Sequence, residues 1–129
     1  MLGAVTRFLL ICLGGAAGTG ARYLCGGWAQ RLFGAAFPYG TLGVNLIGSF
    51  LIVVIMHLGL VKGAISGDLR VVLTTGVMGG FTTYSSFNYE TVGFLRAGAF
   101  GLAFLNIGAT LLGCLVAAGL GLALTRWLF

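Results

Sequence analysis

Charged residues are so rare in this chain that four long stretches contain none of them. These charge-free stretches are residues 8–21, 40–61, 71–89 and 97–125. A helix needs roughly 20 predominantly apolar residues to cross the hydrocarbon core of a membrane. The last three stretches meet or nearly meet this length, and the first does so when it is extended back to Gly3. The pattern predicts an all-α integral membrane protein, a bundle of four helices that span residues near 3–25, 40–61, 69–95 and 98–125.

The composition excludes several classes of protein. Apolar residues make up 59% of the 129 positions and charged residues only 7%, whereas soluble domains carry about a quarter charged residues. The basic residues are scattered and form no stripe, so we expect no nucleic-acid partner. The single His57 has no polar cluster around it in the sequence, which argues against an enzyme. We therefore predict a single transmembrane domain, residues 1–129, surrounded by lipid in the inner or plasma membrane of a cell.

The basic residues are almost evenly divided between the two sides of the predicted bundle. With four spans, both termini and the loop at residues 62–68 share one side. That side carries Arg7, Lys62, Arg70 and Arg126, and the opposite side carries Arg22, Arg31 and Arg96. Four against three is no bias under the positive-inside rule. An antiparallel, dual-topology homodimer is therefore one hypothesis, and a single orientation fixed by another factor is the other.

Glycine is abundant, with 24 residues, and many of these lie inside the predicted spans. Small residues let helix backbones approach closely in a bilayer. The small-x-x-x-small spacing recurs at Gly14 and Gly18, at Gly76 and Gly80, and in the series Gly113, Ala117 and Gly121. This spacing predicts tight helix packing, either within one bundle or between subunits.

Polar residues within the spans are costly in hydrocarbon, so each one needs a partner or a function. In the second span Thr41, Asn45 and Ser49 recur every four residues and share one helical face. In the fourth span Asn106 and Thr110 have the same spacing. Hydrogen bonding between helices accounts for single serine and threonine residues. For the two asparagines, a functional role is an equally good interpretation.

The third span carries the most informative pattern. Residues 74–91 read TTGVMGGFTTYSSFNYET, and adjacent glycines followed by hydroxyls and aromatic rings make a poor continuous helix. We predict a break near Gly79 to Thr83. Irregular backbone at membrane depth persists only where it is buried in protein or lines a polar cavity. Free carbonyls there suit a hard cation such as Na⁺, and helix N-termini attract anions, so the region is predicted to be a functional site.

Two charged residues accompany this region. Glu90 is the one acidic residue expected within or near the membrane. A proton relay, a pore-gating carboxylate and an interfacial residue hydrogen-bonded to the break are all compatible with its position. Arg22 is expected either to pair with a carboxylate or to lie among the lipid headgroups.

Three motifs together resemble one family of membrane proteins. Residues 79–87, GGFTTYSSF, resemble the specific GGxTTFSTF signature of the Fluc (CrcB-type) fluoride channels. Residues 40–45, GTLGVN, match the GTxxVN motif of that family's second helix. Gly18 to Arg22 matches the weaker GxxxR motif of its first helix. The resemblance covers the whole chain in length, order and spacing.

This resemblance implies a dual-topology homodimer with two antiparallel pores through which fluoride leaves the cytoplasm passively. The family's paired signature aromatic residues, which meet fluoride by their ring edges, would fall on Tyr84 and Phe87. Its pore-mouth asparagine would be Asn45. Tyr84 departs from the family by adding a hydroxyl where phenylalanine is usual. Asn106 departs from it as well, since relatives often carry an aromatic residue there.

The remaining site residues follow from the same resemblance. The family's hydroxyl track would correspond to Ser86 and Thr110, with Glu90 below it. A central Na⁺, the one cofactor implied, would be held by the backbone carbonyls of Gly79 and Thr82 in both subunits. Arg22 and Asn106 are assigned to structural or interface roles. The physics agrees, because fluoride is strongly hydrated and a pore must replace its water with convergent hydroxyl, amide and ring-edge donors.

Two other functions compete with a fluoride channel. A proton-coupled exporter of the small multidrug resistance type needs a carboxylate in its first span, and residues 3–25 contain none. A non-transporting membrane assembly subunit explains the packing glycines but not the hydroxyl-rich third span. The fluoride channel is therefore the predicted function.

Overall fold

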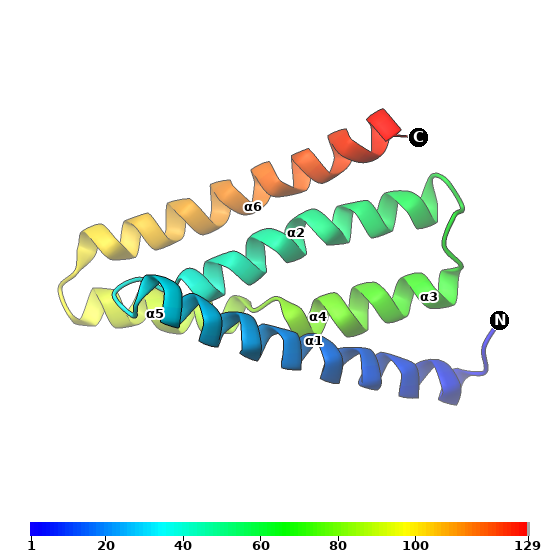
Figure 1. Ribbon diagram of the computed structural model, residues 1–129, viewed down its shortest axis with the longest axis horizontal. Coiled ribbons are helices and arrows are strands. Elements are labelled where there is room, and N and C mark those ends of the chain that lie inside the picture. The colour runs from blue at the N-terminus through cyan, green and yellow to red at the C-terminus, as the bar shows by residue number, and fades with distance from the viewer. Residues whose placement is uncertain (129) are drawn as a thin grey trace.

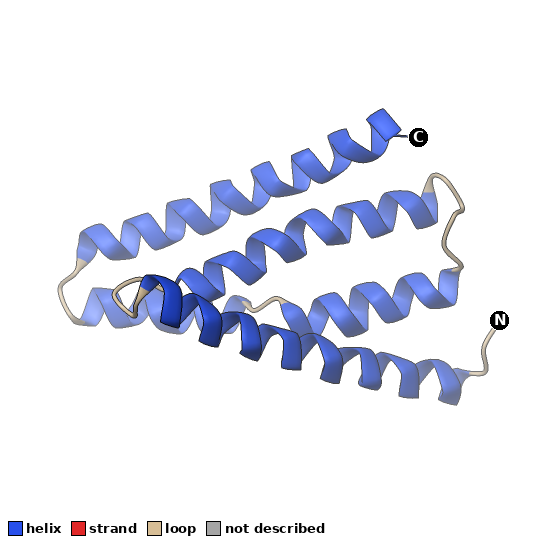
Figure 2. Ribbon diagram, in the orientation of Figure 1, coloured by secondary structure: helices blue, strands red, loops and turns tan. Residues whose placement is uncertain are grey.

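The computed structural model describes residues 1–128, and all regular structure in that part of the chain is helical (Figure 2). The elements are α1 (Ala4–Phe33), α2 (Tyr39–Leu60), α3 (Gly67–Val71), the π-helical segment η1 (Val72–Met78), α4 (Gly79–Phe81), α5 (Tyr84–Arg96) and α6 (Phe100–Leu128). Within the described residues, α1, α2 and α6 are each long and apolar enough to cross a membrane alone. The predicted all-α class is therefore confirmed.

The chain runs back and forth along the long axis of the molecule (Figure 1). Both termini and the α2–α3 connection lie at one end, and the α1–α2 and α5–α6 connections lie at the other. α6 packs along α2, while η1 and α4 pack against α1. α5 continues beyond α4 toward the far end and packs mainly against α6. The third passage along the bundle is thus shared by α3, η1, α4 and α5.

Glycines with positive φ follow three of the helices, with Gly63 (φ 63°) in the connection after α2. Gly34 follows α1 with φ 80°, and its N–H donates to the Gln30 carbonyl. Gly98 follows α5 with φ 71° and donates to the carbonyl of Leu95, while the next N–H donates to that of Phe94. This pair of bonds is a Schellman arrangement, which glycine closes without steric cost. The tight reversal between α5 and α6 follows from it.

α1 is longer than the first predicted span, which ended at Cys25. The helix continues through Gly26 and Gly27 to Phe33. The prediction ended the span early because Arg22 was expected at the membrane surface. In the structure the Arg22 side chain is partly buried and bonded to a backbone carbonyl, so its charge does not require the helix to leave the bundle there.

Glycines determine how closely α1 approaches the third passage. The pairs Gly14–Gly18 and Gly76–Gly80 lie where α1 crosses η1 and α4. A Cβ added to Gly18 would lie 2.9 Å from the amide nitrogen of Phe81, and one on Gly80 would collide with the α1 backbone. The two backbones are therefore in direct contact. For these glycines, packing within one chain is the interpretation that the structure supports.

A second close crossing joins α2 and α6. A Cβ added to Gly121 would lie 2.7 Å from the Phe50 carbonyl oxygen. One added to Gly113 would lie 2.8 Å from a methyl carbon of Leu46. The small residues that the sequence marks as packing sites in the fourth span therefore also make contacts within this chain.

Large apolar side chains cover the outside of the bundle. On α6, Leu112 and Trp127 are 68% and 81% exposed, whereas Asn106 and Thr125 are almost completely buried. Soluble proteins show the opposite distribution. Together with the three long apolar helices, this arrangement identifies a multi-pass membrane protein whose outer surface contacts lipid.

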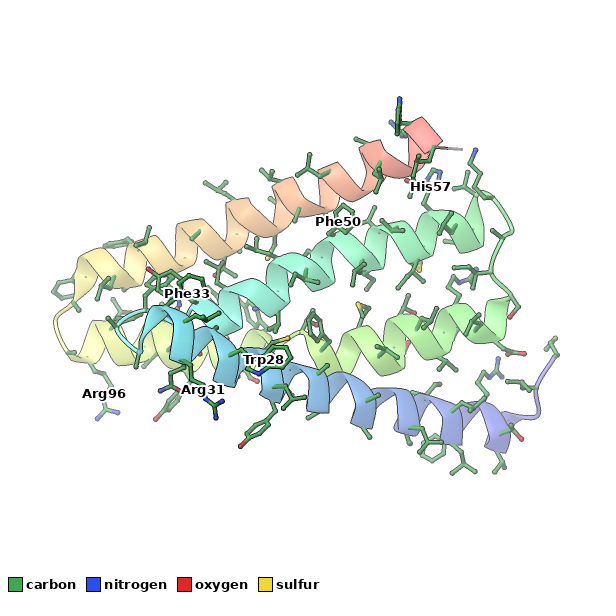
Figure 3. All side chains as sticks on the ribbon, in the orientation of Figure 1. Trp28, Arg31, Phe33, Phe50, His57 and Arg96 are labelled. Carbon is green, nitrogen blue, oxygen red and sulfur yellow. The ribbon has the colours of Figure 1, made fainter. Side chains whose placement is uncertain are left out.

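Two arginines and an aromatic residue lie toward one end of the bundle (Figure 3). Arg31, Phe33 and Arg96 lie toward the end that carries the α1–α2 and α5–α6 connections, and His57 lies near the opposite end. Arginine and aromatic side chains are typical of the interface between lipid tails and water. This end of the bundle therefore lies at a membrane surface.

We expect Gly18→Ala to lower the stability of the folded chain by about 1–3 kcal/mol, because the added methyl group overpacks the contacts with the Val77 carbonyl of η1 and with α4. Gly20→Ala on the same helix is the matched control, since a Cβ there meets no atom within 4 Å. Thermal unfolding in detergent, followed by circular dichroism, measures both variants. Equal melting temperatures for the two would contradict the close crossing.

Candidate functional site

Two extended residues separate α4 from α5. Thr82 has φ −88° and ψ 159°, and Thr83 has φ −153° and ψ 111°. They form the short loop near the middle of the bundle in Figure 1. Both side chains are β-branched, which favours extended backbone over helix. These residues lie within the region that the sequence marks as a site.

Asn45 on α2 holds this extended segment in place. Its side-chain carbonyl accepts the N–H of Thr83 at 2.8 Å, and its amide nitrogen donates to the Thr83 carbonyl at 3.0 Å. Both residues are 8% exposed. The side chain thus satisfies both backbone polar groups of a buried residue that has left the helical pattern. One amide hydrogen of Asn45 is left for a further partner.

The extended segment also removes the helical partners of two carbonyls. In a continuous helix the N–H of Thr83 would bond to the Gly79 carbonyl, and that of Ser86 to the Thr82 carbonyl. Here Thr83 donates to Asn45, and Ser86 donates to the Thr83 hydroxyl at 3.2 Å. The carbonyls of Gly79 and Thr82 therefore lose the donors that an α-helix would supply.

The Thr83 hydroxyl begins α5. It accepts the Ser86 N–H and donates to the Ser86 hydroxyl at 3.0 Å, as an N-cap residue does. The positive end of the α5 dipole therefore lies inside the bundle, close to the extended segment. This position suits an anion.

Arg22 on α1 contacts the other side of the interruption. Its Nε donates to the Gly80 carbonyl at 2.9 Å. The observed partner is thus a backbone carbonyl, and not the carboxylate that one interpretation of the sequence offered. A cation at the C-terminal end of a helix is favourable, because the last carbonyls there lack intrahelical donors.

A cavity of about 440 Å³ lies beside the extended segment, between α2, η1 and α6. It gathers five predicted site residues: Asn45, Gly79, Thr82, Tyr84 and Thr110. Thr110 is 7% exposed, and its buried hydroxyl has no hydrogen-bond partner among the described residues. A buried hydroxyl without a partner is costly, and this one lies at the wall of the cavity with its capacity to donate unused.

The two predicted aromatic residues form a pair on the first turn of α5. The ring centroids of Tyr84 and Phe87 are 5.5 Å apart, and their planes are tilted by 48°. Phe87 is buried at 4% exposure, whereas Tyr84 is 69% exposed on this chain. Ser86 lies between them in sequence and is partly buried. The three residues thus come together at the start of α5.

Glu90 faces a different cavity. This open space of about 800 Å³ lies between α1, α2 and α5, and Arg22, Thr41 and Glu90 are among its lining residues. The Thr41 hydroxyl donates to one Glu90 carboxylate oxygen at 2.5 Å. The other oxygen is buried without a partner in the described part of the chain. The observed partner is thus on α2, and not at the interruption that one interpretation of the sequence favoured.

Asn106 on α6 bonds to α5. Its amide nitrogen donates to the Thr91 hydroxyl at 2.9 Å, and that hydroxyl donates to the Phe87 carbonyl at 2.8 Å. Sequence reasoning missed both Thr91 and the role of Thr83. Thr83 carries a recognisable signal, because a threonine three residues before Ser86 is typical of a helix N-cap. Thr91 lies four residues after Phe87, the spacing at which threonine bonds back to its own helix.

Comparison with known proteins gives a consistent result. The family model described as CrcB-like protein, Camphor Resistance (CrcB), matches residues 9–122. The fluoride-specific ion channel FluC of Anaeromyxobacter sp. (strain K) is 55% identical over 124 residues, 96% of this chain and 98% of its own length. The proteins of the same name from Sorangium cellulosum and Thermus thermophilus are 51% and 50% identical. They are aligned over 93% and 88% of this chain and over 94% and 89% of their own lengths.

We expect Asn45→Ala to destabilise the fold, because it leaves the buried N–H and C=O of Thr83 without partners at about 1–3 kcal/mol for each group. Ser49→Ala, one turn further on the same face of α2 and lining the same cavity, is the matched control. Thermal unfolding of both variants checks this. A melting temperature for Asn45→Ala as high as that of Ser49→Ala would show that Asn45 does not hold the segment.

Proposed function

The chain belongs to the CrcB-like protein family, and from this membership we propose that it forms a fluoride-selective channel in the cell membrane. The name of its curated relatives, fluoride-specific ion channel, supports this function. Ions pass such a channel passively, and fluoride leaves the cytoplasm down its gradient. A channel provides a path and makes or breaks no covalent bond, so the chain is no enzyme.

The observation that carries the proposal is the unpartnered Thr110 hydroxyl at the 440 Å³ cavity. Fluoride accepts short hydrogen bonds, and a hydroxyl with no protein partner is free to donate to it. The remaining amide hydrogen of Asn45 is available at the same cavity. No charged side chain lines this cavity within the described residues, and a pore without a fixed charge does not trap its ion.

In this proposal the third passage of the chain also crosses the membrane, which gives four crossings together with α1, α2 and α6. α3, η1, α4 and α5 together cross as one broken helix, interrupted at Thr82 and Thr83. Support comes from the route of the chain, because α5 begins near the middle of the bundle where α4 ends (Figure 1). Non-helical backbone is tolerated at this depth where it is buried or lines a cavity, and Thr83 is buried while Thr82 lines the cavity.

A central Na⁺ fits the backbone at this interruption. We assign its ligands to the carbonyls of Gly79 and Thr82, whose helical donors are diverted to Asn45 and to the Thr83 hydroxyl. A hard cation prefers such oxygen ligands. The Gly80 carbonyl is engaged by Arg22 and is not part of this set. Na⁺ bound here would be coordinated by the free carbonyls and would join the two subunits of a dimer.

The exposed face of α5 supports an antiparallel homodimer. Tyr84, Ser85, Asn88 and Tyr89 are all exposed on the single chain, whereas most of the large side chains exposed on α1, α2 and α6 are apolar. Polar groups that face lipid at this depth are costly, so a second copy of the chain covers them in our proposal. The near-equal division of basic residues between the two ends allows both orientations to insert.

The aromatic pair contributes to ion selectivity. Tyr84 and Phe87 lie at the start of α5, and the edge of an aromatic ring carries positive partial charge. Ring edges and hydroxyls together replace the water of a small anion. Chloride is larger and gains less from donors at close range, so the same path rejects it. Ser86 and Glu90 extend this path along α5.

Thr110→Val removes the unpartnered hydroxyl while keeping the shape of the side chain. We expect fluoride efflux from liposomes to slow about fivefold, which corresponds to a lost hydrogen bond of about 1 kcal/mol. Thr125→Val is the matched control, since Thr125 is also buried on α6 but donates to carbonyls of its own helix. Fluoride-selective electrode recordings give both rates, with chloride efflux measured in parallel.

Two outcomes of these recordings would contradict the proposal. Equal efflux of fluoride and chloride from liposomes with the native protein would exclude a fluoride-selective channel. A normal fluoride rate in Thr110→Val would remove this hydroxyl from the ion path.

Charge at the loops tests the dual topology. Val61→Lys with Ala64→Lys adds charge at one end of the bundle, and Ala36→Lys with Ala97→Lys adds it at the other. We expect each double variant to insert in one orientation. When it is expressed without the other, it should therefore give no fluoride efflux. Co-expression of the two should restore efflux, because opposite orientations then meet.

Topology tags on the C-terminus report the orientation in these cells. A native chain found in one orientation only would exclude the antiparallel homodimer. Full efflux from either double variant alone, with its orientation fixed, would exclude it as well.

A further inference from the structure

α5 is held in the bundle largely by polar contacts. Only Phe87 and Thr91 are buried along this helix. Side-chain hydrogen bonds tie it to its neighbours at three points: Asn45 holds Thr83 just before it, Thr41 holds Glu90, and Asn106 holds Thr91. The first two come from α2 and the third from α6. Apolar contacts add to these bonds, since the Phe87 ring is buried and Phe94 stacks on Phe37. The rotation of α5 about its axis therefore depends on polar and apolar contacts together.

The bond from α6 leads directly to the aromatic residue of the ion path. Asn106 donates to the Thr91 hydroxyl, which in turn donates to the Phe87 carbonyl one helical turn earlier. Asn106 is 1% exposed and Thr91 is 7% exposed, so no water replaces either group from the surface. Each donor in this series has its acceptor within 2.9 Å. The series joins α6 to the turn of α5 that carries the Phe87 ring.

Asn106 lies on the same face of α6 as Thr110, whose hydroxyl has no partner among the described residues. Thr110 follows Asn106 by one turn on α6, so both residues lie on the face that meets the rest of the bundle. The bond to Thr91 therefore fixes the rotation of α5 relative to the Thr110 hydroxyl. A change of one residue in helical register would turn a side chain by about 100°.

We propose that Asn106 is a positioning residue of the channel, which acts through Thr91 to fix the turn of α5 that carries the Phe87 ring. This inference rests on the proposed function, because the placement of the ring matters only if the ring contributes to the ion path. Asn106 itself touches no ion in this proposal. Its effect on conduction comes from the rotation of α5.

Fluoride efflux from Asn106→Leu, Thr91→Val and the double variant tests the inference. A single hydrogen bond between helices contributes little to folding in a bilayer, so the variants are expected to assemble. Each single variant should slow efflux about threefold to tenfold, and the double variant should be no slower than the slower single one. Thr91→Ser keeps the hydroxyl and should conduct at close to the native rate.

The assay separates positioning from simple loss of packing. The fraction of liposomes that empties counts the assembled channels, whereas the rate in those liposomes reports conduction. A purely structural role would lower the fraction and leave the rate unchanged, which would overturn the inference. A native rate in Thr91→Val, or effects of the two single variants that multiply in the double variant, would also overturn it. An absence of fluoride efflux from the native protein would instead contradict the proposed function, and this inference with it.

Discussion

The two hydrogen bonds between the Asn45 side chain and the Thr83 backbone are the interaction on which the site depends. They hold Thr83 extended and take its N–H away from the Gly79 carbonyl. The Thr83 hydroxyl then takes the Ser86 N–H from the Thr82 carbonyl and begins α5. One amide side chain on α2 thereby frees two carbonyls and places the positive end of a helix inside the bundle. The proposed cation site and the proposed anion path share this single origin.

The surrounding lipid determines how the bundle is packed and where its polar groups lie. A lipid-facing chain gains little from burying apolar side chains, so the glycine contacts of α1 with η1 and α4 supplement a small apolar core of Val44, Met78 and Phe81. Polar groups, in contrast, must be satisfied inside. Most of them are, through bonds such as that of Arg22 to Gly80 and that of Thr41 to Glu90. Three buried atoms among the described residues are exceptions: His57 Nε2, the Thr110 hydroxyl and one Glu90 oxygen. The last two lie at the two cavities where an ion path passes in our proposal.

Sequence reasoning predicted the helices well where hydropathy alone defines them. α2 and α6 follow the charge-free stretches closely, whereas α1 continues past its predicted end because Arg22 bonds to a carbonyl that no sequence pattern reveals. The glycines and hydroxyls of residues 79–83 indicate irregular backbone, but not that Thr82 and Thr83 are the extended pair. Asn45 was predicted as a site residue, yet its contact with Thr83 spans 38 positions and depends on the packing of α2. Thr91 was missed because a threonine within a helix has no distinctive signature until its partner on α6 is known.

The central claim is that polar backbone at this interruption and the unpartnered Thr110 hydroxyl beside it form a passive path for fluoride. A planar bilayer recording tests it most directly, with a fluoride gradient across the membrane and equal chloride on both sides. The account predicts currents that reverse at the equilibrium potential of fluoride, with no measurable contribution from chloride. Reversal at zero voltage despite the fluoride gradient would contradict it.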